Sequence, residues 1–408
     1  MKEALEEVFA EVSRNRDYAV NILTNLIKIR AVNPAFGGEG EFKRCLYLEK
    51  VLRELSPDSL QIIDVPDSRV PEGVRRNIVA IFEGSTRERL WIIAHTDTVP
   101  EGDRSLWKSD PYTPIISDGK IFGRGAEDNG QAIASSILAV KALRDAGIKP
   151  RVRIGLVFAA DEEAGSTYGI KALMRRNTFG KSDLIVVPDA GSPKGDFIEV
   201  AEKHILWLKI TVVGRQAHAS MPHMGINAHR IGMKFALLLD EVLHAKFHER
   251  NELFSPPTST FEPTKKEKNI DNVNTIPGVD VVYFDCRVLP GYDLNEVLEI
   301  VHTLKENFEK VYRVRINVEV IARSEAPPPT SPQSKVVQKL KTAIKLVTGL
   351  DARVGGIGGG TFAAIFRRVG YQAAVWSTVD ETAHQPNEYA RIANILQDAK
   401  VFATMALI

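Results

Sequence analysis

The sequence predicts an α/β protein in which a catalytic domain with a mostly parallel sheet is interrupted by an inserted α+β domain with an antiparallel sheet. Three observations predict it: apolar strands alternate with helices up to about residue 190, the pattern then changes, and it returns near the end of the chain. At 408 residues the chain exceeds what one hydrophobic core usually supports, so two domains are expected.

The first part of the chain, residues 1–195, has the alternating pattern. Apolar residues recur at helical spacing over 3–29 and again over 42–55. A further helix over 132–146 is closed by Gly147 and Pro150. Apolar runs indicate strands at 77–82, 90–94, 152–160 and 184–187. Strands that alternate with helices are typical of a parallel sheet covered by helices.

The middle part, residues 196–325, follows a turn-rich segment and has a different order of elements. A long alternating stretch over 197–213 indicates the strands of a hairpin. The elements expected after it are a helix, a strand, a helix and a strand, over 226–243, 279–288, 294–308 and 314–322. This order predicts a compact α+β unit with an antiparallel sheet, and its length is typical of one domain.

The last part, residues 326–408, begins at a stiff proline-rich hinge and returns to the α/β pattern. Helices are expected over 335–347 and 362–369, a strand over 373–377, and a final helix from Arg391. This part carries His384, whereas the other candidate ligands lie before residue 190. A shared site requires the first and last parts to form one discontinuous domain.

Composition narrows the function classes. The 53 basic residues almost cancel the 52 acidic ones, and no Lys/Arg tract occurs, so no nucleic acid or membrane partner is expected and the partner is a small molecule. Cys45 and Cys286 form neither a disulfide framework nor a metal motif, which fits a reducing compartment. With no signal-peptide pattern and no long apolar span, a cytoplasmic protein is expected.

Carboxylates and imidazoles follow the predicted strands or lie in nearby loops. These residues are His95, Asp97, Asp128, Glu162, Glu163, Asp189 and His384. Each has an ordinary alternative: a capping or surface role for the first two, a helix N-cap for Asp128, a solvated acidic loop, a turn, or a structural histidine. Together they supply ligands for two neighbouring divalent cations, because the carboxyl ends of parallel strands share one edge.

Spacing suggests roles within this set. Asp97 is spaced to accept the second N–H of a metal-bound His95. Asp128, on a glycine-rich turn before a helix, could bind a different cation with each oxygen. If Glu163 is a ligand, Glu162 points elsewhere and can move a proton from water to a leaving amine. The set therefore predicts metal-assisted hydrolysis.

The ordered motifs resemble those of the co-catalytic metallopeptidase and deacylase family that includes aminoacylase, carboxypeptidase G, succinyl-diaminopimelate desuccinylase, acetylornithine deacetylase and several dipeptidases. The motifs are 95–97, 123–128, 161–163, 188–189 and 384–388. The resemblance implies two zinc ions, with cobalt or manganese also tolerated by the ligand types. It implies that His95 and Asp189 bind one ion, that Glu163 and His384 bind the other, and that Asp128 bridges them. Glu162 would be the general base, acting on a water activated between the metals.

The resemblance extends to the inserted unit, residues 196–325, which is similar to the family's lid or dimerisation domain. Segment 214–222 matches the family segment whose histidine reaches the active site of the partner subunit, which nominates His218 as an oxyanion donor and implies a homodimer. Asn274 and Arg287 match positions that contact a substrate carboxylate, although an Arg paired with a nearby acid is the ordinary alternative. A glycine run with Gly359, Gly360 and Thr361 opens a helix; it could bind an anion or serve only as a packing turn.

Two departures bear on the substrate. Asp189 stands where deacylases of this family tend to carry Glu, and the run 359–363 resembles the dipeptidase branch. The expected function is therefore hydrolysis of dipeptides or short peptides with a free carboxylate. An N-acyl-amino-acid deacylase is the alternative, because the lid is of the simple size found in dimeric deacylases. A metal- or peptide-binding protein without catalysis is a third, and the presence of Glu162 argues against it.

Overall fold

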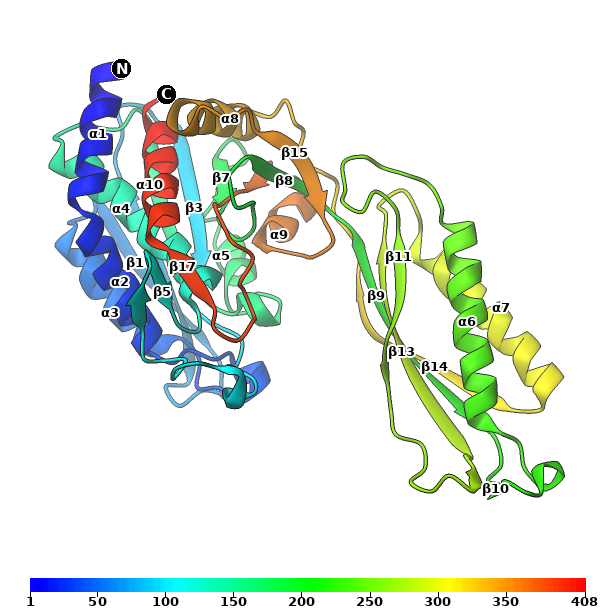
Figure 1. Ribbon diagram of the computed structural model, residues 1–408. Helices are drawn as coiled ribbons and strands as arrows, with labels where there is room; N and C mark the ends of the chain where they lie inside the picture. The colour runs from blue at the N-terminus through cyan, green and yellow to red at the C-terminus, as the bar shows by residue number, and fades with distance from the viewer. The chain divides into compact units, whose positions relative to one another are not determined.

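The computed structural model describes residues 1–408, which form two units (Figure 1). The first unit comprises residues 1–200, 329–354 and 361–408, and the second comprises 201–328 and 355–360. Strands β8 (Phe197–Glu202) and β15 (Arg353–Ile357) contain two of the boundaries. The predicted fold class is confirmed, since a large mixed sheet and a separate antiparallel sheet are both present.

The first unit is built on an eight-stranded sheet in the order β1-β2-β6-β3-β7-β16-β8-β15. Neighbours β6, β3, β7 and β16 are parallel, which places their carboxyl ends at one edge. Besides β8 and β15, the sheet contains β1 (Ser59–Pro66), β2 (Val74–Phe82), β3 (Arg89–His95), β6 (Arg153–Ala159), β7 (Leu184–Val187) and β16 (Ala373–Val375). Strands β3, β6 and β7 are buried almost throughout, which explains their continuous apolar sequences.

Helices cover both faces of this sheet. One face packs against α5 (Ile170–Arg175) and α9 (Phe362–Arg368), whose Leu173 and Phe366 belong to a single apolar cluster with the strands. The other face packs against α4 (Ala132–Asp145), α8 (Lys335–Thr348) and α10 (Ile392–Leu407), as Figure 1 shows. The N-terminal helices are α1 (Lys2–Arg14), α2 (Arg16–Lys28) and α3 (Phe42–Glu54). The expected single helix over 3–29 is thus divided at Asn15, whose amide donates to the Glu11 carbonyl.

A small three-stranded sheet joins two distant loops of the first unit. It contains β4 (Ile115–Ser117), β5 (Lys120–Phe122) and β17 (Tyr389–Arg391), in the order β17-β5-β4. Tyr389 lies opposite Phe122, so the chain after His384 runs beside the chain that leads to Asp128. These short strands were not predicted, because three residues are too few to display an alternating pattern.

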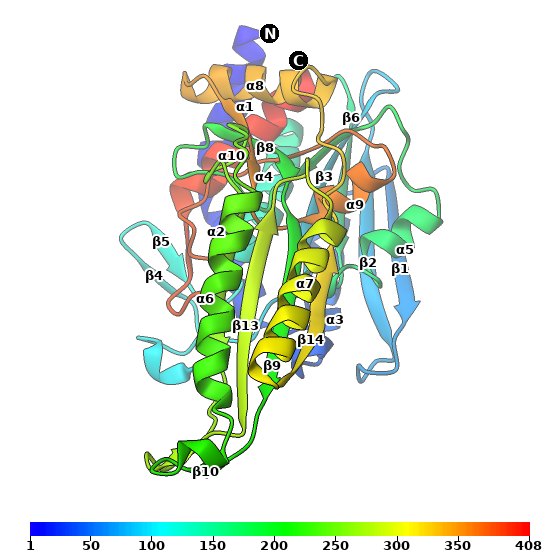
Figure 2. The same cartoon turned by 90° about the vertical axis from the view of Figure 1, so that its right-hand side faces the viewer.

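The second unit has a four-stranded antiparallel sheet in the order β11-β13-β9-β14. Its long strands are β9 (His204–Val213), β11 (Thr260–Lys266), β13 (Val279–Val288) and β14 (Arg315–Ser324). Helices α6 (Ala228–Lys246) and α7 (Leu294–Tyr312) cover one face (Figure 2). Alternate residues of β9, such as Leu206 and Leu208, enter the core beneath them, as the alternating sequence predicts.

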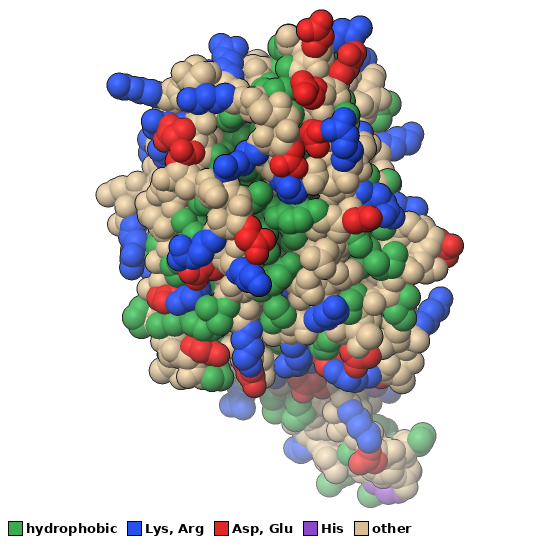
Figure 3. Space-filling view, turned by 90° about the vertical axis from the view of Figure 1, so that its left-hand side faces the viewer, with side chains coloured by type: hydrophobic (Ala, Val, Ile, Leu, Met, Phe, Trp, Pro, Cys, Tyr) green, Lys and Arg blue, Asp and Glu red, His purple; other side chains and the backbone are tan.

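The surface carries charges of both signs, as the nearly equal numbers of basic and acidic residues predict. On the face of the first unit drawn in Figure 3, basic and acidic side chains are interspersed and no broad field of one sign appears. None of the helices combines the length and the apolar character needed to span a membrane.

Asp398 on α10 gives a test of the core of the first unit. Burial raises the pKa of Asp398 to about 7, against hydrogen bonds from Thr378, Ser377 and Gln131 that favour the ionised form. The folded state therefore holds the Asp398 proton more tightly than the unfolded chain does. Protonated Asp398 stabilises the fold at low pH, and this stabilisation is lost as pH rises from about 4 to 7. We expect Asp398→Asn to remove this contribution.

The measurement is denaturant unfolding of the wild type and Asp398→Asn at pH 4.5 and pH 7. The free energy of unfolding of the wild type should decline relative to that of the variant between these two values. A difference that does not change with pH would contradict the raised pKa.

Candidate active site

The candidate metal ligands converge at the carboxyl edge of the large sheet in the first unit. His95 at the end of β3 lies opposite Ala159 at the end of β6, so His95 and the acidic loop after β6 leave the sheet at the same level. Val187 at the end of β7 lies opposite Val375 on β16, and these strands lead to Asp189 and to the loop of His384. Parallel strand order thus brings residues from four loops together.

Asp128 lies at the centre of this cluster. Its Oδ1 is 2.7 Å from Nε2 of His95, and its Oδ2 is 2.9 Å from Nε2 of His384. The residue belongs to an irregular turn, Ala126–Gln131, that precedes α4, and its backbone is not helical there. Because each oxygen faces a different imidazole, the carboxylate is arranged to bridge two cations.

The remaining predicted ligands divide between the two imidazoles. Asp189 Oδ1 is 3.4 Å from Nε2 of His95, and Glu163 Oε2 is 3.3 Å from Nε2 of His384. Glu162 joins His95 and Asp189 in a group whose potential ligand atoms all lie within 4.8 Å of one another. The structure therefore brings together all five residues predicted to bind metal. Glu162 lies beside His95 and Asp189.

The pKa values of both histidines are raised by the acidic residues around them. Hydrogen bonds to Asp128 and Glu163 raise the pKa of His384 to about 10. Burial opposes protonation of His95, yet the charge of Asp128 raises the pKa of His95 well above its ordinary value. The carboxylates around each imidazole therefore favour positive charge at its position.

The pKa values of the two acids after β6 are raised as well, which for a carboxyl group favours the uncharged form. Burial, with the charge of Asp128, raises the pKa of Glu163 to about 7. Burial, with the charge of Asp189, raises the pKa of Glu162 well above its usual range. Glu163 Oε1 is also buried and accepts no hydrogen bond. Carboxylates that repel one another around an unsatisfied oxygen, with two imidazoles beside them, fit a pair of divalent cations.

Asp97 supports both His95 and the acidic loop. His95 Nδ1 lies 3.0 Å from the carbonyl oxygen of Asp97 and 3.6 Å from its carboxylate, so the orienting contact goes mainly through the carbonyl. Because a carbonyl only accepts, Nδ1 carries the proton and Nε2 faces the cluster. The Asp97 carboxylate instead accepts from the backbone N–H groups of Glu162 at 3.0 Å and Glu163 at 3.3 Å.

A buried polar network lies behind this loop. The Asn33 amide donates to Asp97 at 2.7 Å and to Asp161 at 3.1 Å. Arg75 donates to both oxygens of Glu41, at 2.7 and 2.6 Å, and also reaches Asp161 at 3.3 Å. Because all these groups are buried, they hold one another in a fixed arrangement beneath the acidic loop.

Asn129 is a positioning residue that the sequence did not reveal. Its amide donates to Asp189 Oδ1 at 3.0 Å and to the Pro188 carbonyl at 2.9 Å, and its Oδ1 accepts from His95 N at 3.3 Å. Asn129 thus ties two of the ligand-bearing loops together. Its place directly after Asp128 was the only available signal, and that signal equally suggested a helix cap.

His218 and Asn274 belong to the second unit, where they lie on adjacent segments. β10 (Ala217–His218) pairs with β12 (Thr275–Ile276), and Ala219 N donates to the Asn274 carbonyl at 2.8 Å. Ser220 N donates to His218 Nδ1 at 3.1 Å. A neutral His218 therefore carries its proton on Nε2, where it can act as a hydrogen-bond donor.

The other predicted substrate contacts have partners within the protein. Arg287 donates to Asp285 at 2.6 and 3.0 Å and to the Gly358 carbonyl at 2.7 Å, so it holds the start of the glycine run. Gly359 and Gly360 follow in the second unit. Thr361 Oγ1 accepts from Ala363 N at 3.1 Å and thereby caps α9.

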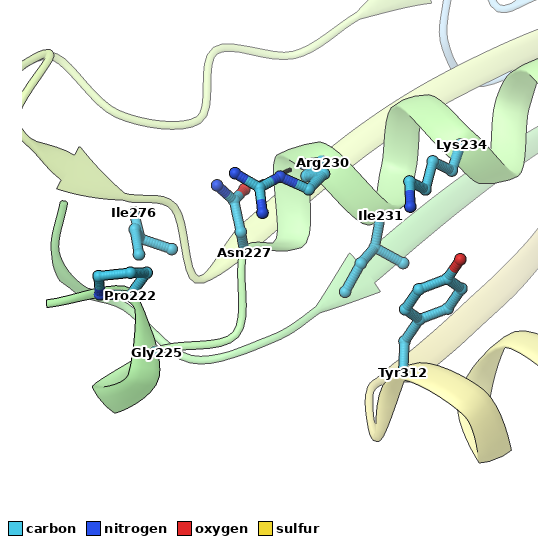
Figure 4. A pocket seen from close by; sticks show the side chains of 8 residues that line it. All are labelled: Pro222, Gly225, Asn227, Arg230, Ile231, Lys234, Ile276 and Tyr312. Atoms are coloured by element: carbon cyan, nitrogen blue, oxygen red, sulfur yellow. Dashed lines mark hydrogen bonds between the residues drawn. The ribbon is translucent and has the colours of Figure 1, made fainter.

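A pocket of about 280 Å³ lies within the second unit next to β12 (Figure 4). Arg230 and Lys234 line it from α6, Tyr312 from the end of α7, and Ile276 from β12 itself. The Lys234 ammonium lies 5.3 Å from the centroid of the Tyr312 ring. These basic residues were not candidates in the sequence, because exposed Arg and Lys four positions apart are typical of any solvated helix face.

Comparison with known proteins identifies relatives over most of the chain. The family model described as peptidase family M20/M25/M40 matches residues 91–408. An uncharacterized metallohydrolase of Methanocaldococcus jannaschii is 43% identical over 399 residues, covering 94% of this chain and 97% of that protein. Succinyl-diaminopimelate desuccinylase of Acinetobacter baylyi is 25% identical over 323 residues, covering 78% and 83%.

Among solved structures, human carnosine dipeptidase 1 has a similar fold. The TM-score is 0.77 at 20% sequence identity, and the match covers 99% of this chain and 98% of that one.

Proposed function

The chain belongs to peptidase family M20/M25/M40 and is a metallohydrolase, and from this premise we propose that it hydrolyses dipeptides or short peptides that carry a free carboxylate. The observation that carries the proposal is the Asp128 carboxylate, whose two oxygens face His95 and His384. We propose that His95 and Asp189 hold one divalent cation and that Glu163 and His384 hold the other. Zinc suits this ligand set best, and cobalt or manganese also fits it.

Cations held by these residues would polarise the scissile carbonyl and the attacking water as Lewis acids. Glu162 then accepts the proton of the water and delivers it to the leaving nitrogen. Its burial and the nearby Asp189 raise its pKa, which favours Glu162 as a proton acceptor. Asp97 accepts a hydrogen bond from the backbone N–H of Glu162 and thereby keeps Glu162 in place.

His218 is proposed to donate a hydrogen bond to the oxyanion that forms on the scissile carbonyl. The contact from Ser220 N supports this role, because it leaves Nε2 of neutral His218 as the donor. We propose that His218 serves the site of a partner subunit, as the family resemblance implies, and that the protein acts as a homodimer.

The peptide substrate is supported by Asp189 and by the run 359–363, both of which resemble the dipeptidase branch. The alternative is an N-acyl-amino-acid deacylase, which is favoured by the sequence similarity to succinyl-diaminopimelate desuccinylase. Both substrates present an amide bond next to a carboxylate, so the same metal chemistry serves either one.

Replacing Glu162 tests the assigned proton carrier. Glu162→Gln keeps the size of the side chain but removes the base, so we expect kcat to fall by about 100-fold or more, the usual effect of losing a general acid–base group. Metal analysis should still find about two ions per chain, as the proposed ligand set implies. Full activity in the folded variant would exclude Glu162 as the base.

A substrate panel separates the two hydrolase classes. Dipeptides, N-acetyl amino acids and N-succinyl amino acids would be compared by kcat/KM, with zinc, cobalt or manganese added to chelator-treated enzyme. We expect the free dipeptide to be preferred over the same dipeptide with an amidated C-terminus, which lacks the carboxylate. Preference for N-succinyl substrates would favour the deacylase, and activity without any metal would contradict both.

Subunit mixing tests the shared site. A His218→Ala chain and a Glu162→Ala chain are each expected to be nearly inactive alone. A mixed dimer contains one site with both residues intact, so mixing should recover part of the wild-type activity. As a control, each variant is dissociated and reassociated by itself. Verified mixed dimers without recovered activity would contradict the proposed exchange of His218.

A further inference from the structure

Two acidic side chains link the loop of Asp128 to the loop of His384. Glu127 accepts hydrogen bonds from the backbone N–H groups of Asp380 at 2.8 Å, of Ala383 at 3.2 Å, and of Thr382. Glu388, which follows His384, makes the reverse connection: it accepts hydrogen bonds from backbone N–H groups in the turn that contains Asp128. These donors are Gly125 at 3.0 Å, Glu127 at 2.9 Å and Asp128 at 3.0 Å.

Both carboxylates are buried, but their partners differ. Glu388 also pairs with the Arg124 guanidinium at 2.6 Å, whereas the hydrogen bonds to Glu127 come from residues 380–383 and include three backbone N–H groups. A buried carboxylate is costly unless it is fully hydrogen-bonded. Any movement of residues 380–383 would leave Glu127 unsatisfied, so this side chain holds that loop in one position.

The two imidazoles depend on this linkage to different degrees. His95 is buried at the end of a central strand, and Asn129 and Asp97 fix its backbone and its ring. His384 lies on a loop, its side chain is 56% exposed, and its backbone has a φ of +63°. Packing therefore contributes little to the direction of His384, and the hydrogen bonds of the preceding residues 380–383 must supply it.

We infer that Glu127 is a positioning residue for one of the two cations, the one assigned to His384 and Glu163. This inference rests on the proposed two-metal site. The cation assigned to His95 and Asp189 is held by strand ends that Glu127 does not contact, so its affinity should be independent of Glu127. Loss of a hydrogen bond that orients a metal ligand typically weakens metal binding by about 10- to 100-fold.

The test uses Glu127→Gln in the full-length protein, with Glu381→Gln as the matched control, since Glu381 is exposed on the same loop. Metal-depleted proteins would be titrated with zinc and with cobalt by calorimetry. We expect the wild type and Glu381→Gln to bind two ions per chain. Glu127→Gln should bind one ion with unchanged affinity and the other about 10- to 100-fold more weakly.

Hydrogen exchange gives a readout that does not require metal. In metal-depleted Glu127→Gln, the amides of residues 380–383 should exchange faster than in the wild type, while those of β3 should be unchanged. Glu127→Asp keeps the charge on a shorter side chain, so its effect on amide exchange should be intermediate. This variant tests the same role if Glu127→Gln folds poorly.

The possible failures are distinguishable. Wild-type protein that binds fewer than two ions would contradict the proposed function itself. A folded Glu127→Gln protein that binds two ions with unchanged affinities would overturn only the role of Glu127. Equal weakening of both ions would also overturn it, because the effect would then be general rather than specific to His384.

Discussion

The position of one carboxylate between two imidazoles is the constraint on which the rest of the first unit depends. Asp128 can face His95 with one oxygen and His384 with the other only if a strand end, a turn and a distant loop are fixed relative to one another. The parallel order of β6, β3, β7 and β16 provides the common edge, and the pairing of β5 with β17 brings the last loop to it. Fold and site are thus two consequences of the same strand order.

Such a site is stable only if its surroundings are rigid, because it concentrates buried acids that repel one another. The structure meets this requirement with hydrogen bonds from backbone and amide groups. Asp97 holds the acidic loop, Asn129 connects His95 to Asp189, and Glu127 holds the loop of His384. Burial and repulsion by neighbouring acids raise the pKa values of Glu162 and Glu163, and bound cations would stabilise the ionised carboxylates against both effects.

The candidate ligands could be recognised in the sequence more readily than the residues that position them. His95, Glu163 and Asp189 follow long apolar strands, and this pattern can be recognised without a structure. By contrast, Asn33 lies more than 60 residues from Asp97 in the sequence, and Glu127 lies more than 250 residues from the backbone amides that donate hydrogen bonds to it. Contacts over such distances depend on the three-dimensional path of the chain. Arg287 illustrates the same limit, since only the structure reveals its pairing with Asp285.

The most direct test of this account is a crystal structure of the metal-loaded protein with anomalous data collected at the absorption edge of the added metal. We expect two cations about 3.5–4 Å apart, one bound to each oxygen of Asp128, with His95 on one cation and His384 on the other. A single fully occupied ion, or two ions without Asp128 between them, would contradict the central claim.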